Sequence, residues 1–118
     1  MPGVSLRERL RAALPAAMKA RDRTAMSALR ATLSAIDNAE AVDRPAGADR
    51  GLSIEQSAVG VGAMEVARRD LTDDDVERIV RAEIAERETA AAGYTESGRV
   101  DRAEQLRAEA AVLTALLR

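Results

Sequence analysis

The 118-residue sequence contains no cysteine, no histidine, no tryptophan and no phenylalanine, and Tyr94 is its only aromatic residue. Without cysteine there are no disulfides and no thiolate chemistry. Without histidine the chain lacks the usual general base, the commonest zinc ligand and the base of a Ser-His or Cys-His pair. One aromatic side chain cannot provide a series of stacking platforms for bases. The sequence therefore predicts no catalytic residue, no metal site and no cofactor.

Long apolar runs are missing too. No stretch approaches the ~18 apolar residues of a membrane span, and charged residues 7–9 interrupt the region where a signal peptide would be apolar. Leu, Ile and Val make up 24 of the 118 residues, but the net charge of −2 is too small to favour disorder. We expect a soluble, cytoplasmic protein with a thin, alanine-lined core that a protein partner or a second copy completes.

Apolar periodicity predicts four helices, at about residues 5–20, 23–42, 73–97 and 101–117. Ser5 with Glu8 has the capping-box pattern, and Asp22 marks the start of the second helix. Pro15 predicts a kink in the first helix because its nitrogen carries no hydrogen. The apolar stripes of this first pair are Leu6, Leu10, Leu14 and Met18, then Met26, Leu29, Leu33 and Ile36.

The second pair of helices has its own boundary signals. Thr72 precedes three aspartates, Gly98 suits a helix end, and Asp101 with Glu104 predicts a second capping box. Between the pairs, residues 43–71 contain a proline and four glycines without helical period, which predicts a long irregular loop. The predicted fold is an all-α, four-helix array of two helical hairpins in one domain spanning residues 1–118.

Four features of the sequence allow both a functional and a structural interpretation. Residues 60–62, Gly-Val-Gly, begin like a dinucleotide-binding loop, but Glu65 stands where the third glycine belongs, which favours a tight backbone path. Arg68, Arg69 and the basic first two helices suit phosphates, whereas a solvated face with ion pairs such as Glu83–Arg87 is the structural alternative. Tyr94 either binds a ligand or anchors a helix end. Residues 73–75 are interpreted as caps, since neighbouring helical residues point about 100° apart and cannot share an ion.

The order and spacing of several short motifs carry a resemblance along most of the chain. They are Leu6, the run 17–22 (Ala-Met-Lys-Ala-Arg-Asp), Leu29-Arg30, Leu33, Asn38, Arg69-Asp70-Leu71-Thr72, Arg87-Glu88, Tyr94, Gly98-Arg99, Asp101, Ala103, Leu106, Glu109 and Leu113. This pattern resembles the YqeY family, also called GatB/YqeY-domain proteins.

The resemblance implies a helical domain from a family linked to tRNA-dependent amidotransfer. Members usually continue with a Leu-Pro motif and a second small helical domain, which is similar to the tRNA-engaging tail of the amidotransferase B subunit. Since the sequence ends at Arg118, we expect the N-terminal helical domain alone. The family supplies no catalytic residue to carry over.

Three functions follow, in order of preference. The first is a non-catalytic accessory protein that binds a protein partner through an exposed helix face or the long loop. The second is tRNA or other RNA binding through the basic first two helices. The third is a part in a carbon–nitrogen ligase system with glutamine as amido donor, for which no nucleophile and base are present. Neither DNA nor a membrane is indicated as a partner. The candidate binding residues are Arg21, Arg30, Asn38, Glu65, Arg68, Arg69 and Tyr94.

Overall fold

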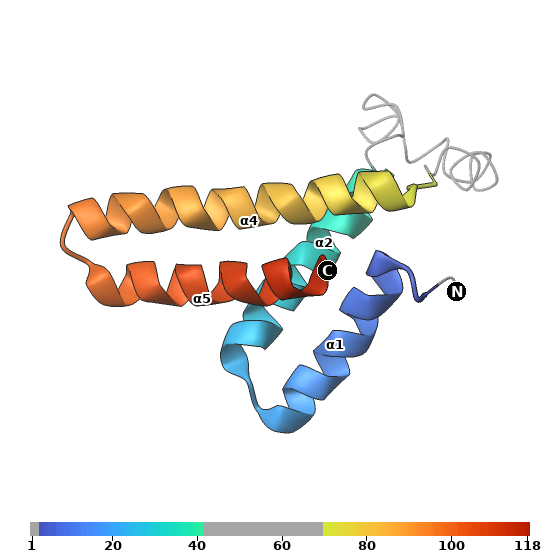
Figure 1. The fold of residues 1–118 in the computed structure, drawn as a ribbon, viewed down its shortest axis with the longest axis horizontal. Coiled ribbons are helices and arrows are strands. Elements are labelled where there is room, and N and C mark those ends of the chain that lie inside the picture. Colours follow the sequence, from blue (N-terminus) through green and yellow to red (C-terminus); the bar gives the residue numbers. More distant parts are fainter. Residues whose placement is uncertain (1–2, 42–69) are drawn as a thin grey trace, which may run out of the picture.

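The computed structural model describes residues 3–41 and 70–118, which form four α-helices and no strand within those ranges. The helices are α1 (Leu6–Ala20), α2 (Arg23–Ala41), α4 (Asp73–Glu96) and α5 (Val100–Leu116). They make two hairpins, α1–α2 and α4–α5 (Figure 1). The predicted all-α, four-helix array is confirmed, and each helix begins and ends within one residue of its expected bounds. The expected loop over residues 43–71 lies outside the described residues, apart from its last two, and the single-domain assignment stays a prediction.

The α1–α2 hairpin has the helix ends that its sequence predicts. The Ser5 hydroxyl accepts the Glu8 N–H at 3.2 Å, and the Glu8 carboxylate accepts the Ser5 N–H at 3.2 Å, completing the capping box. The Asp22 carboxylate accepts the Ala25 N–H at 3.0 Å at the start of α2. Helix α1 continues through Pro15 to Ala20. Arg21 then ends it in the left-handed conformation, with φ at 59°, a region that costs energy for any residue except glycine.

The α4–α5 hairpin corrects one expectation. Thr72 and Asp75 form a capping box at α4, and Gly98 has φ at 84° in the turn, as the sequence suggests. The predicted capping box of Asp101 with Glu104 is wrong, because α5 begins at Val100 and its N-cap Arg99 makes no side-chain cap hydrogen bond. The Arg99 N–H donates to the Tyr94 carbonyl at 2.8 Å, so the turn closes early and Asp101 already lies in the first turn of α5.

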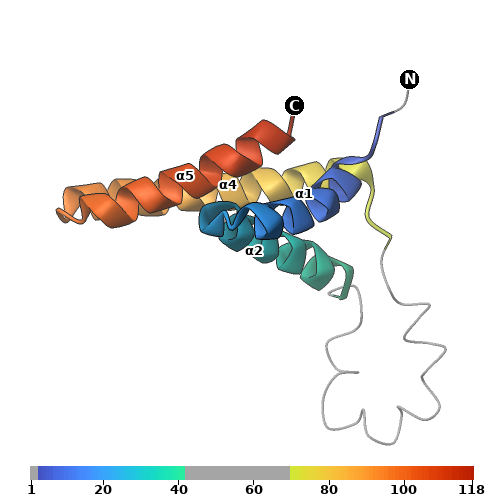
Figure 2. The same ribbon diagram turned by 90° about the horizontal axis from the view of Figure 1, so that it is seen from below.

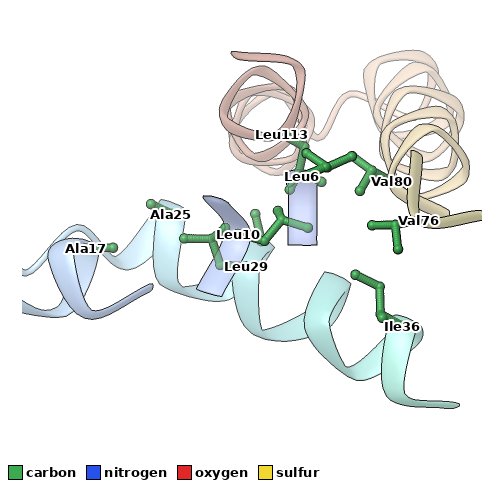
Figure 3. Packing of buried hydrophobic residues seen from close by; sticks show 10 residues of the cluster. Leu6, Leu10, Ala17, Ala25, Leu29, Ile36, Val76, Val80 and Leu113 are labelled. Carbon is green, nitrogen blue, oxygen red and sulfur yellow. The ribbon is translucent and has the colours of Figure 1, made fainter. Parts of the chain in front are cut away.

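The core lies where the α1–α2 hairpin packs against the beginning of α4 and the end of α5 (Figure 3). The side chains buried most completely there are Leu10, Leu29, Ile36, Val76, Val80 and Leu113. Met18, placed on the predicted stripe of α1, is instead 49% exposed. Residues four apart on a helix drift by about 40°, so the stripe has turned by roughly 120° between Leu6 and Met18 and has left the core.

Small side chains fill the far half of the α4–α5 hairpin, which is the half toward the turn at Gly98. Ala91 and Ala103 are fully buried between the two helices, and Ala110 is 3% exposed. Figures 1 and 2 show this half extending away from α1 and α2. Since alanine lets helices approach closely but buries little apolar area, this half has the thin core that the composition suggests.

Candidate functional site

The candidate residues do not form one site. Arg21 lies at the turn between α1 and α2, while Arg30 and Asn38 are exposed on α2. Tyr94 lies near the end of α4, in the part of the hairpin that extends away from them (Figure 1). The remaining candidates, Glu65, Arg68 and Arg69, lie outside the described residues, as does the Gly-Val-Gly motif at 60–62.

One face of α2 is polar from its first residue onward. Arg23, Ser27, Arg30 and Ser34 follow each other at spacings of four, three and four, and all are exposed. The buried residues of the helix lie on the other side, namely Ala25, Ala28, Leu29, Thr32 and Ile36. The packing of α2 into the core therefore presents two arginines and two serines outward.

We define the basic surface as Lys19, Arg21, Arg23 and Arg30. All four are exposed, and none forms an ion pair in the part of the chain that the structure describes. The acidic residues of this hairpin are engaged elsewhere: Glu8 and Asp22 cap helices, while Asp37 and Glu40 contact Arg7. These four carboxylates therefore do not neutralise the basic surface.

Arg7 holds the first turn of α1 to the last turns of α2. Its guanidinium lies 2.7 Å from Glu40 and 3.7 Å from Asp37. The hydrogen bond with Glu40, which outweighs the effect of burial, raises the pKa of Arg7. This arginine is a structural cation and is separate from the basic surface.

A second ion-pair network lies inside the α4–α5 hairpin. Arg87 donates through Nε to Glu109 at 2.9 Å and through Nη1 to Glu83 at 2.9 Å, and Gln105 donates to the other oxygen of Glu109 at 3.2 Å. Burial lowers the pKa of Arg87, but the hydrogen bonds that Arg87 donates to Glu83 and Glu109, together with the negative charges of these carboxylates, outweigh it and raise the pKa. The Glu83–Arg87 pair exists as expected, yet the expectation of a solvated pair is wrong, because the Arg87 side chain is only 10% exposed and that of Glu83 only 19%.

Tyr94 is held at the end of the hairpin by its neighbours. The guanidinium carbons of Arg99 and Arg102 lie 6.0 and 5.8 Å from the ring centroid, within reach of a cation–π contact. Nearby, Arg107 donates to the Thr95 hydroxyl at 3.2 Å. This geometry favours the helix-end anchor over the ligand-binding alternative for Tyr94.

A groove of about 590 Å³ runs along the α4–α5 hairpin. It is lined by Glu88 of α4 and by a stripe of α5 in which Arg107 and Arg118 flank the small residues of the floor, Ala110, Ala111, Thr114 and Ala115. Thr114 in the floor lies about 200° around α5 from Leu116, which packs against the core. The groove therefore opens on the side of α5 that faces away from the core.

In residues 3–41 and 70–118, no group of acidic side chains is arranged to hold a metal ion. None of the helices described is long and apolar enough to cross a membrane.

The fold and these surfaces define a small all-α protein whose charged residues either join helices or lie open to solvent. The family model of Yqey-like proteins matches residues 48–117, which is more than half of the chain. The chain belongs to this family, as the sequence motifs suggest. The matched range includes α4 and α5, while α1 and α2 precede it. No curated protein and no solved structure matches the chain.

Proposed function

We propose that this YqeY-like chain is a non-catalytic accessory protein that binds RNA through the basic surface of the α1–α2 hairpin. The observation that carries the proposal is the set of four exposed cations without an ion pair in the described residues. Unpaired arginine and lysine side chains that replace counterions along a phosphate backbone supply most of non-specific nucleic-acid affinity. Arginine adds a planar fork that fits phosphate oxygens.

The spacing along α2 supports contacts to more than one phosphate. Arg23 and Arg30 are seven residues apart on the same face, which corresponds to about 10 Å along the helix. Ser27 and Ser34 lie between and beyond them and supply hydroxyl donors, which commonly contact phosphates. Because Tyr94 is the only aromatic side chain in the sequence and lies on the other hairpin, we expect backbone contacts and little base recognition.

The resemblance to proteins of tRNA-dependent amidotransfer makes tRNA the first RNA to test. Binding of a protein partner was the first preference from the sequence. A different surface, the groove along α4–α5, favours that hypothesis. A role in a carbon–nitrogen ligase system stays a prediction.

The test is a titration of labelled tRNA with the full chain at about 50 mM and about 200 mM salt. We expect binding that weakens with salt, and a variant with R23A and R30A that binds more weakly with a salt slope lower by about one to two. The matched control carries R78A and R81A, which removes two exposed arginines of α4 that pair with Asp75 and Glu77. Salt-independent binding, or equal losses in both variants, contradicts the proposal.

A further inference from the structure

The two helices that line the α4–α5 groove contribute opposite charges. Glu88 comes from α4, whereas Arg107 and Arg118 come from α5. The Arg87–Glu109 hydrogen bond sets the register, because it places residue 87 opposite residue 109 in the antiparallel pair. Glu88 therefore stands opposite residue 108, one position from Arg107. No ion pair joins these two side chains across the groove in the described structure.

The side chains beside these charges are small, so another helix can approach closely. Ala111, Thr114 and Ala115 of α5 line the groove. On α4, Ala85 and Ala92 are exposed and lie three residues before and four after Glu88, so they share its side of the helix. Helices packed through small side chains approach to the short end of the usual 8–10 Å range.

We propose that a second copy of this chain occupies the groove, in a dimer whose two-fold axis runs along the hairpin. Rotation by 180° about this axis places α4 of each copy beside α5 of the other. Each residue keeps its position along the axis, so residues that are opposite each other within one hairpin are also opposite each other between the copies. Glu88 then meets Arg107 of the partner subunit, and the symmetry forms this contact twice. The two hairpins together make a four-helix bundle.

A second copy fits this groove because each copy supplies both halves of the pattern. Glu88 of each copy faces Arg107 of the partner subunit, and Ala85 of each copy lies at the level of Ala111 of the partner subunit. Ala111, Thr114 and Ala115 are exposed in the groove, so covering it with a second copy adds apolar burial to a hairpin whose far half buries only alanines and the Arg87–Glu109 pair. This inference goes beyond the RNA-binding proposal, which concerns the other hairpin.

The experiment measures the association of the full chain by sedimentation equilibrium over a range of concentrations, without RNA. We expect the wild type to form dimers. E88R and R107E each place like charges opposite each other twice and are expected to weaken dimerisation by at least about tenfold. The double variant E88R/R107E restores opposite charges at both contacts, and is expected to recover dimerisation.

Two further variants complete the test. E86R makes the same charge change on α4, but residue 86 lies about 160° around the helix from residue 88, so dimerisation is expected to stay as in the wild type. A111R puts a long side chain into the floor and is expected to give monomers. A wild type that stays monomeric overturns the proposal. This is the result expected if a different protein, and not a second copy, fills the groove. A double variant that associates no better than the two single ones, or an E86R variant as weak as E88R, also overturns it.

Discussion

At the scale of single residues, Arg87 is a cation held in the interior of a helical hairpin. Its partners Glu83 and Glu109 come from both helices of the hairpin. Removing one partner of a buried pair leaves the other charge without compensation, whereas replacing both by apolar residues is often nearly neutral. Arg87 therefore fixes the register of α4 against α5 more than it adds stability.

The expected result for R87A is a loss of about 3 kcal/mol in the free energy of unfolding, since Glu109 keeps only Gln105 as a partner. The double replacement R87M/E109M is expected to cost about 1 kcal/mol or less. Urea unfolding curves measure both values. The pKa of Arg87 is raised on folding, so its contribution is present below the ordinary arginine pKa and is lost only above it. The difference between wild type and R87A is thus expected to stay the same across neutral pH. Equal losses in the single and double variants would show that the pair is not the cause.

Part of this ion-pair network can be predicted from the sequence. The spacing of four between Glu83 and Arg87 is readable, because residues at that spacing are neighbours on a helix. Glu109 is 22 residues away from Arg87 in the sequence, and the two meet only because the turn at Gly98 brings α5 back along α4. Burial of the pair was not readable either, because nothing in the local pattern distinguishes it from an exposed pair.

At the scale of helices, two glycines of α4 and its following turn have opposite roles. Gly93 lies within α4 with helical φ and has no atom near the position of an added Cβ. Gly98 also has space, but its φ of 84° is one that other residues rarely adopt. G93A is expected to stabilise the protein by about 0.5–1 kcal/mol, and G98A to destabilise it by about 1 kcal/mol. Thermal unfolding of the two variants checks this, and a shift of both in the same direction contradicts it.

The helix boundaries were the most predictable part of the fold. Ser5, Asp22 and Thr72 cap their helices through their own side chains, and such caps have a clear sequence pattern. The start of α5 was misjudged because Arg99, a residue type with no capping preference, takes the N-cap position. There the backbone geometry of the turn, which includes Gly98, decides the boundary.

At the scale of the whole molecule, the sequence predicts two hairpins and leaves their relative placement open. That placement depends on which side of α5 packs on α1 and α2. Leu113, Leu116 and Leu117 all offer apolar surface, and the fold buries Leu113 fully while the other two pack at the edge. The groove follows from that choice, since it lies on the side of α5 that remains exposed. For this reason Arg30 and Asn38 were predictable as candidates singly, but their separation from Tyr94 was not.

In the proposed RNA-binding role, Arg21 connects the stability of the fold with the affinity for RNA. Its left-handed backbone costs about 1 kcal/mol relative to glycine, although the same position carries one charge of the basic surface. The variant R21G is therefore expected to gain about 1 kcal/mol in the free energy of unfolding and to lose affinity for tRNA, with a salt slope lower by about one. Urea unfolding and the tRNA titration on the same preparation measure both effects, and a variant that loses stability or keeps its full affinity contradicts the prediction. The substitution that stabilises the fold at this turn is thus predicted to weaken the proposed RNA binding, so a screen for thermostable variants alone is expected to select against that binding.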